Sequence, residues 1–422
     1  MGNVIEILTK MQDYENEIEE RNFHASSLKR SLEPIFVKNG YRNFFSNDIP
    51  KILIIYDGGV GDFIMFTPVL RELKRLYGQG KITLLVPHFL ENIAEVCPYK
   101  DDMIIDPYRH KQFYKKDSFK LYLHAGLAEK LLTYRFNIVF NFSISDNGAI
   151  LGYLSGAQER ILCLDHILGA AGDKEIPIVT AQELSTMTVS VKPKSRHAVD
   201  EYLRVLDEMM RVPIRNREME VWFIPDDLQE VYKKAQLKDD AVYVIFGLGG
   251  MTRRKHWPVE RYVKLAEKIL RQEKDIKFVL VGGSKETGDA EVLSKALPKD
   301  KCYNLVNKLT YRQTAAAMSY CHLYVGNDTG SMHIAAALKI PVLAVFACPE
   351  TNDPAIFTIV ERVFPYGVPA VVVRPDKRLP ECIPQDGSFS INGCVQDTPH
   401  CITQVTVEDM WEGYCALLKM LS

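Results

Sequence analysis

The apolar run KILIIY at residues 51–56 is followed directly by a glycine-rich segment, DGGVGD. An apolar run without polar alternation is typical of a strand buried on both faces of a parallel sheet. Apolar residues at helical spacing follow over 63–76, and strands are predicted at 82–86 and 138–142, with a helix at 127–134. Strands that alternate with helices in this way predict a doubly wound α/β domain.

The same alternation resumes after a polar, proline-punctuated stretch at 211–227, which we interpret as a linker. Strands are predicted at 242–246, 277–281, 322–325 and 342–346, with helices at 259–272 and 311–319. A chain of 422 residues also exceeds the roughly 250–300 residues at which one core stops growing. We therefore predict two facing Rossmann-like domains, at 48–215 and 225–405, and a closing helix at 406–422, with a ligand cleft at the carboxyl ends of both sheets.

The first 47 residues are predicted to form a helical extension, because apolar residues recur there at helical spacing among many charges. This extension is a candidate surface for self-association into a homo-oligomer. The same segment carries acidic residues throughout and has no apolar core of the kind that a secretory signal needs.

The overall charge and hydropathy favour a cytoplasmic protein. A net charge of −2, from 52 basic and 54 acidic residues, provides no global field that would attract nucleic acid. The sequence has no run of the roughly 20 apolar residues needed to span a bilayer, so a peripheral place at the inner face of the membrane is the strongest membrane association that we expect. Nine cysteines in such a chain indicate reduced thiols rather than a disulfide framework.

Asp62 is the first candidate for chemistry, in the turn DGGVGD between the first strand and its helix. Glycines permit a tight turn that places this carboxylate at the helix start. An N-terminal cap is the alternative role for the same residue. The glycines do not form the G-x-G-x-x-G fingerprint, which argues against a dehydrogenase.

A second candidate site follows the first strand of the C-terminal domain, in GLGGMTRRKHWP at 247–258. Glycines at a strand end, followed by the hydroxyl of Thr252 and three cations that include Lys255, suit the charge of a diphosphate. The alternative is a solvated basic turn before a helix. The segment lacks the G-K-[ST] ending of a P-loop, which argues against nucleotide hydrolysis.

The third candidate site is GNDTGSMH at 326–333, between a strand and an alanine-rich helix. Free amides at that helix start, together with the helix dipole, form an anion-binding cradle. Helix capping explains Asp328 and Thr329 equally well, and a packed histidine is the alternative role for His333.

These segments together resemble the glycosyltransferase family 9 heptosyltransferases, which have two facing Rossmann-like domains in the GT-B fold. The resemblance covers roughly residues 50–350 and is carried by GDFIMFTP, RFNIVFNFS, GGMTRRKHWP, FVLVGGSKE and VGNDTGSMH. It implies an inverting transfer of heptose from ADP-heptose to an acceptor hydroxyl of bacterial lipopolysaccharide core or another surface glycan. It also implies that catalysis requires no divalent metal.

The resemblance further implies a role for individual residues. Asp62 would be the general base and Lys255 would neutralise the departing diphosphate. Asp328 would hold sugar hydroxyls, and Glu286 would contact the ribose. The remaining donor-binding residues would be Gly61, Gly250, Thr252, Thr329, Gly330, Ser331, Met332 and His333.

Three cysteines, Cys382, Cys394 and Cys401, lie in a loop at 380–402 that is rich in Pro, Gly and Ser. Such a loop buries little apolar surface, so a structural zinc or iron ion is a reasonable source of order. Cys348 or His400 is a candidate fourth ligand, and free thiols are the alternative. A metal-bearing cysteine loop resembles the autotransporter heptosyltransferases, which modify serines of bacterial surface proteins and form large oligomers.

Other functional classes remain open at this point. A protein O-heptosyltransferase would use the same donor with a serine acceptor. A nucleotide-sugar epimerase would need the diphosphate contacts but no acceptor, and a non-catalytic nucleotide-sugar-binding scaffold would bind without turnover, because fold alone does not imply activity.

Overall fold

The computed structural model describes residues 49–107, 125–143, 146–164, 178–190, 197–238 except 212, 241–349 except 251, 359–379 except 378, and 398–422. It also describes residues 6, 9–10, 29–30 and 33–34. Most of the predicted N-terminal extension and most of the cysteine-rich loop lie outside these ranges and stay predictions.

The chain divides into two compact units that are not contiguous in sequence. The first comprises Met1–Gly58, Val69–Lys194 and Glu201–Arg215, and the second comprises Gly59–Pro68, Ser195–Asp200 and Asn216–Ser422. The second unit therefore includes the segment that carries Asp62, which the contiguous domain boundaries predicted above do not place there. None of the described helices is long and apolar enough to cross a membrane.

The first unit is built on a six-stranded parallel sheet in the order β3-β2-β1-β4-β5-β6. Chain order reverses between β1 and β4, as in a doubly wound fold. The elements of this part of the chain are β1 (Lys51–Ile55), α3 (Val60–Tyr77), β2 (Lys81–Pro87), a 3₁₀ helix (His88–Leu90), α4 (Glu91–Ala94), β3 (Asp102–Asp106), α5 (Ala125–Tyr134), β4 (Ile138–Asn141), α6 (Asp146–Leu154), β5 (Glu159–Leu164), α8 (Ile178–Leu184), β6 (Met187–Ser190) and α9 (Ala198–Met210).

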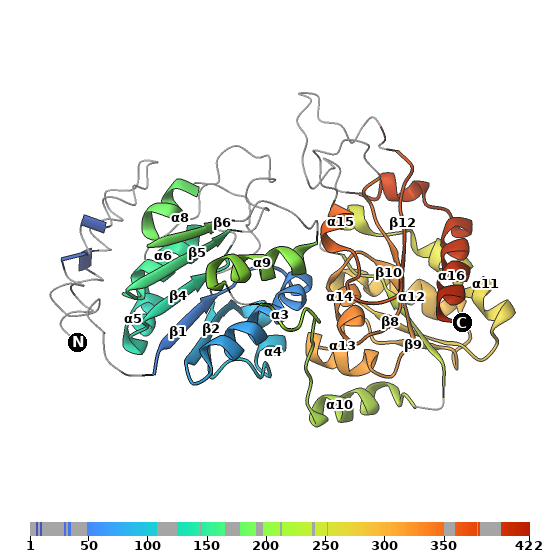
Figure 1. Ribbon diagram of the computed structural model, residues 1–422. Helices are drawn as coiled ribbons and strands as arrows, with labels where there is room; N and C mark the ends of the chain where they lie inside the picture. The colour runs from blue at the N-terminus through green and yellow to red at the C-terminus, as the bar shows by residue number, and fades with distance from the viewer. Residues whose placement is uncertain are drawn as a thin grey trace. The chain divides into compact units, whose positions relative to one another are not determined.

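The second unit has a parallel sheet with the same winding, in the order β12-β11-β10-β7-β8-β9. Figure 1 labels β12, β10, β8 and β9 of this sheet. Here the reversal falls between β7 and β10. The elements are α10 (Pro225–Ala235), β7 (Tyr243–Gly247), 3₁₀ helix η3 (Arg253–Lys255), α11 (Val259–Gln272), β8 (Lys277–Val281), 3₁₀ helix η4 (Ser284–Glu286), α12 (Thr287–Ala296), β9 (Cys302–Asn304), α13 (Tyr311–Met318), β10 (Leu323–Asn327), α14 (Gly330–Ala337), β11 (Val342–Val345), α15 (Ile359–Val363), β12 (Ala370–Val373), a 3₁₀ helix (Cys401–Gln404) and α16 (Val407–Leu421).

The two-domain α/β fold predicted from the sequence is confirmed, and each predicted strand and helix outside the N-terminal extension lies within a few residues of an observed one. The strands that the sequence did not indicate are β3, β5, β6, β9 and β12. Four of these five, β3, β6, β9 and β12, are the edge strands of the two sheets. The edge strands β3, β6 and β9 contain polar residues, so they carry little of the apolar signal that marks a central strand, whereas β12 is an apolar run of four residues.

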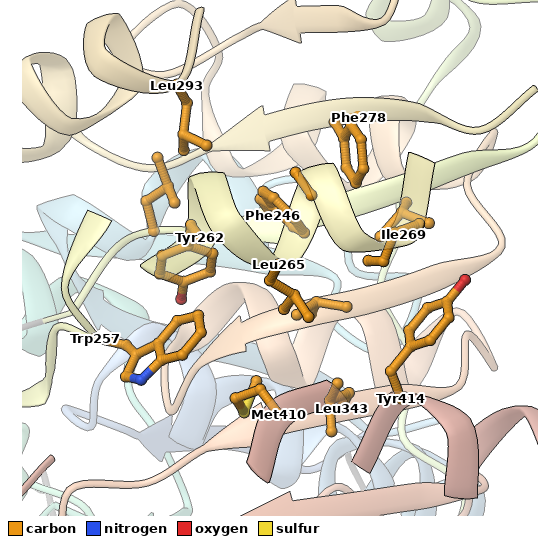
Figure 2. Packing of buried hydrophobic residues seen from close by; sticks show 14 of the residues in the cluster. Phe246, Trp257, Tyr262, Leu265, Ile269, Phe278, Leu293, Leu343, Met410 and Tyr414 are labelled. Atoms are coloured by element: carbon orange, nitrogen blue, oxygen red, sulfur yellow. The ribbon is translucent and has the colours of Figure 1, made fainter. Parts of the chain in front are cut away.

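The core of the second unit joins α11 and α16 to the sheet. Tyr262, Leu265 and Ile269 recur at helical spacing on α11 and are almost fully buried, in one cluster with Phe246 of β7. Figure 2 shows Trp257 and Tyr262 in this cluster, with Met410 and Tyr414 from α16. This packing holds the loop before α11 in place, since Trp257 also donates its indole N–H to the Val405 carbonyl at 2.8 Å.

Candidate active site

Loops from the carboxyl ends of β7 and β10 meet where the strand order of the second sheet reverses, which is where open α/β sheets bind ligands. Asn327, at the end of β10, is fully buried and joins the two loops. Its Oδ1 accepts hydrogen bonds from the Trp257 amide at 3.0 Å and the Tyr262 hydroxyl at 3.1 Å. Its Nδ2 donates to the carbonyls of Leu248 at 2.8 Å and Gly249 at 3.2 Å. All four hydrogen-bonding positions of this amide are therefore used to position the site.

Glycine is required where β7 and β10 end. A Cβ on Gly326 would lie 2.8 Å from the Gly247 Cα, closer than real Cβ atoms approach backbone. The absence of both side chains lets the strands end side by side, and it leaves room for the hydroxyl of Tyr324, which donates to the Asn327 carbonyl at 3.1 Å.

Lys255 and Asp328 form an ion pair, with Nζ 2.6 Å from Oδ2. Lys255 ends a 3₁₀ helix that begins after Thr252, and Asp328 directly follows β10. Burial by itself would lower the pKa of Lys255, but the carboxylate of Asp328 outweighs it, so this pKa lies above its usual value and the ammonium stays charged. The structure thus fixes a positive charge and a carboxylate together in a largely desolvated place.

The N-terminus of α14 follows Asp328 directly in the sequence and presents backbone amides and side-chain hydroxyls. Thr329 is the N-cap residue, but its side chain makes no cap hydrogen bond. Its hydroxyl lies instead 2.7 Å from the Ser331 hydroxyl, which is 3.1 Å from the Tyr324 hydroxyl. Capping therefore does not account for Thr329, and the first amides of α14 retain their capacity to bind an anion.

Asp62 lies in the first turn of α3, and its Oδ2 accepts the Gly59 amide at 3.2 Å. In this contact the third residue of the helix accepts the amide of the residue that precedes the helix, so Asp62 helps to close the helix start without being its N-cap residue. The carboxylate nevertheless acts electrostatically on both Lys255 and His333. It is half-buried, and capping uses only one of its two oxygens. The cap therefore orients a carboxylate that belongs to the same unit as the ion pair.

Two glycines allow the start of α3 to pack against the start of α14. A Cβ on Gly61 would lie 2.6 Å from the His333 Cδ2, and a Cβ on Gly330 would lie 3.2 Å from the Val60 Cβ. The close approach brings two helix N-termini together. Two positive dipole ends at one place reinforce each other's attraction for an anion.

His333 is buried at 3% exposure, and its Nδ1 has no hydrogen-bond partner among the described residues. Burial lowers its pKa, although the nearby carboxylates of Asp328 and Asp62 oppose this effect and Lys255 adds to it. The ring is therefore neutral at physiological pH. An unpaired buried nitrogen costs about 1–3 kcal/mol, a cost that a bound partner would remove.

Thr252, Gly250 and Glu286 lie around the loops that follow β7 and β8. The Thr252 hydroxyl is buried without a partner among the described residues, like the Nδ1 of His256. The other nitrogen of His256, Nε2, is 3.3 Å from the Gly250 carbonyl and 3.7 Å from the Glu286 carboxylate. Glu286 accepts the Gly283 amide at 2.7 Å, so its carboxylate has a fixed orientation.

His197 is buried in the surroundings of the site, and no sequence motif pointed to it. Its Nε2–H donates to the Phe364 carbonyl at 2.7 Å, and its Nδ1 accepts the Val199 amide at 3.1 Å. Burial lowers its pKa to about 4, and His333 is among the groups that act on it. A histidine directly before a helix is the only local signal, and it does not distinguish this role from a cap.

Only part of the predicted cysteine cluster lies within the described residues. Cys382 and Cys394 lie outside the described residues, while Cys401 is buried and accepts the Leu379 amide at 3.5 Å. Cys348 is half-buried and acts electrostatically on Lys255. Within the described ranges no group of three or more His, Cys, Asp or Glu side chains is arranged to hold a metal. The metal site stays a prediction.

Comparison with known proteins places this geometry in a family. Residues 169–374 match the model of glycosyltransferase family 9 (heptosyltransferase). Lipooligosaccharide heptosyltransferase 2 of Haemophilus influenzae is 24% identical over 320 residues, which cover 72% of this chain and 86% of that protein. The family 9 glycosyl transferase structure from Veillonella parvula has a TM-score of 0.68 at 21% identity, covering 90% of this chain and 100% of the other. The Escherichia coli ADP-heptose lps heptosyltransferase II structure has a TM-score of 0.65 at 19% identity, covering 88% and 99%.

The two parallel six-stranded sheets match these structures in the GT-B fold, and the family match indicates a glycosyltransferase. The match to the glycosyltransferase family 9 (heptosyltransferase) model lies within residues 169–374, and over 72% of its length the chain is similar to a lipooligosaccharide heptosyltransferase. The family resemblance inferred from the sequence is confirmed.

Proposed function

We propose that this enzyme transfers a heptose from ADP-heptose to an acceptor hydroxyl of the lipopolysaccharide inner core, with inversion at the anomeric carbon. The observation that carries the proposal is the Lys255–Asp328 ion pair of 2.6 Å next to the N-terminus of α14, with the Asp62 carboxylate acting on the same lysine. The relatives support the acceptor class, since they are lipooligosaccharide and lipopolysaccharide heptosyltransferases. A cytoplasmic site of reaction is part of the proposal.

The donor's diphosphate is the leaving group, and it needs positive charge where its oxygen departs. Lys255 supplies a fixed ammonium, and the amides of residues 329–331 supply preorganised donors at the start of a helix, while the Met332 amide donates to the Thr329 carbonyl. The Thr252 hydroxyl, which has no partner among the described residues, provides another donor. The family resemblance assigns Asp328 to the sugar hydroxyls and Glu286 to the ribose.

Asp62 is the proposed general base. The bond from the anomeric carbon to the diphosphate oxygen breaks as the acceptor oxygen attacks from the opposite face, and the acceptor's proton passes to the carboxylate. The Gly59 amide holds Oδ2 at 3.2 Å, which leaves Oδ1 to receive the proton. The lysine and the helix dipoles would supply the charge that a divalent metal supplies elsewhere, so we propose that no metal is essential.

A donor screen tests this proposal. The full chain would be incubated with ADP-heptose, UDP-glucose or GDP-mannose and with a heptose-deficient lipopolysaccharide extract, and the products would be read by mass spectrometry. We expect ADP release and a heptose-bearing lipid product only with ADP-heptose. Chelation of divalent metals should leave the rate unchanged.

Three outcomes would overturn the proposal in different ways. A heptosylated serine peptide and an unmodified lipid would assign a protein acceptor. A free sugar isomer without transfer would indicate an epimerase. Tight ADP-heptose binding by calorimetry without turnover would indicate a scaffold.

A further inference from the structure

The loops at the carboxyl ends of the strands in the second sheet lie in the same order as the strands. The strand sequence β10-β7-β8-β9 places the α14 start first, then the loop with Lys255, then the Gly282–Glu286 loop, then the segment that leads into α13. A diphosphate bound between the first two loops would leave its nucleoside over the third and fourth. This reasoning rests on the proposed function.

The third and fourth loops are joined to each other. The Asn307 amide donates to the Gly282 carbonyl at 3.0 Å, and the Leu305 amide donates to the Leu280 carbonyl at 3.0 Å. The segment after β9 therefore follows the end of β8 closely. Tyr311 begins α13 directly beyond it, and the Thr310 side chain caps that helix by accepting the Gln313 amide at 3.2 Å.

The floor of this region has almost no side chains. Gly249, Gly282 and Gly283 surround the Glu286 carboxylate, and a Cβ on any of the three would lie 3.2–3.8 Å from Glu286 or its loop. A carboxylate set in a surface of glycine backbone can accept hydrogen bonds from two neighbouring hydroxyls, as a ribose offers.

Beside these loops, Tyr311 is an aromatic residue that the core does not use. It is 45% exposed, although its helix is otherwise anchored by buried alanines. The Glu286 carboxylate acts on it and, after burial, is the second cause that raises the pKa of its phenol. The hydrogen bonds between the third and fourth loops place the start of α13 beside the loop that carries Glu286, and nearly half of Tyr311 is exposed for contact.

We propose that Tyr311 is the residue on which the nucleobase of the donor stacks. A base is joined to the ribose, so ribose contacts at Glu286 place it within reach of the start of α13. Stacking on an aromatic ring needs a π-face and no particular hydrogen bond. Tyr311 therefore contributes affinity for the nucleoside part of the donor and none for its diphosphate.

Calorimetry with ADP and with inorganic pyrophosphate tests the assignment. Tyr311→Ala should raise the Kd of ADP about tenfold, which corresponds to the usual strength of base–aromatic stacking. Tyr311→Phe keeps the ring and should bind ADP like the wild type. Neither variant should change pyrophosphate inhibition of transfer. Tyr232→Ala is the matched control, because Tyr232 is 57% exposed on α10 in the same unit.

The outcomes separate this inference from the proposed function. If the wild type fails to bind ADP, the proposed function fails with it. If the wild type binds ADP and Tyr311→Ala binds equally well, stacking is refuted while the transferase stands. Loss of affinity in Tyr311→Phe equal to that in Tyr311→Ala would also refute stacking, since it would trace the affinity to the phenol hydroxyl. Thermal melting of each variant checks that the fold is retained.

Discussion

Lys255 and Asp328 show how one contact combines binding and stability. The carboxylate of Asp328 is only 8% exposed, so it depends on the ammonium 2.6 Å away. Removing one partner of a buried ion pair leaves the other charge uncompensated. The pair is therefore both the proposed diphosphate site and a structural link between the loops after β7 and β10.

Lys255→Ala is expected to lower transfer by orders of magnitude and to raise the Kd of ADP at least tenfold, because the leaving diphosphate loses its cation. Unfolding by urea should show a loss of about 1–3 kcal/mol from the unpaired Asp328. Lys233→Ala is a suitable control, since Lys233 is 66% exposed in a surface pair with Glu230. Transfer by Lys255→Ala at a rate near that of the wild type would remove the lysine from the mechanism.

His197 makes stability depend on pH in a predictable direction. Burial lowers its pKa from 6.5 to about 4, with His333 and Arg362 acting in the same direction and the Phe364 carbonyl and Asp200 opposing them. The unfolded chain therefore binds the proton more readily than the folded chain below about pH 6.5. The stability that the neutral ring provides is complete above that pH and is lost as the pH falls toward 4.

Urea unfolding between pH 7 and pH 4 measures this effect. The free energy of unfolding of the wild type should fall by about 3 kcal/mol more than that of His197→Gln over this interval. The difference between the two proteins cancels the contribution of titratable groups that do not interact with His197. Parallel curves for the two proteins would show that His197 does not carry the dependence.

At the scale of elements, the sequence predicted the strands and turns that are determined by local apolar runs and glycines. Central strands such as β1 and β7 are continuous apolar runs, and the glycines after them mark the turns that carry Asp62, Thr252 and Lys255. Each donor-binding or catalytic residue that the sequence suggested follows a strand or lies near the start of a helix. These candidates could be selected from the sequence because the fold places ligand-binding loops at strand ends.

Contacts between distant residues were not predictable in this way. Asn327 joins its loop to Trp257, which lies 70 positions earlier, and His197 bonds a carbonyl 167 positions later. Nothing in the local pattern of either residue distinguishes these roles from a surface turn or a cap. The same holds for Gly61, whose need for glycine arises from the ring of His333 in another helix.

The docking of α16 provides a test at this scale. Gly413 lies where α16 meets the sheet, and a Cβ there would lie 2.8 Å from Leu343 Cδ1 and 3.0 Å from Val373 Cγ2. Gly413→Leu should therefore destabilise the protein by about 1–3 kcal/mol through overpacking. Gly288→Leu is the matched helical control, because a Cβ at Gly288 meets nothing within 4 Å. Equal melting temperatures for the two variants would contradict the packing described for α16.

At the scale of the whole molecule, the compact units differ from a simple division of the chain. Residues 59–68 and 195–200 pack with the second unit, which otherwise begins at Asn216. The helix α3 passes from one unit to the other at Pro68, where a proline interrupts its hydrogen bonds. A contiguous sequence pattern cannot reveal such a division, because it depends on which neighbours each segment contacts.

The cysteine-rich loop carries a prediction for the whole protein. Cys382, Cys394 and Cys401, with Cys348 or His400, are expected to hold one zinc or iron ion per chain, since the loop composition offers little apolar burial. Elemental analysis of the purified full-length protein measures this directly. Replacement of Cys394 by Ser should abolish the metal content, and a wild-type protein without stoichiometric metal would end the proposal.

The central claim is that Asp62 acts as the general base. The rate of transfer by Asp62→Asn tests it most directly. The substitution keeps the size of the side chain and an oxygen that can accept the Gly59 amide, so the fold and the donor site should be retained. We predict that the Kd of ADP changes by no more than about twofold while turnover of ADP-heptose with its acceptor falls by about a hundredfold or more. Turnover close to that of the wild type, at equal ADP affinity, would contradict the account.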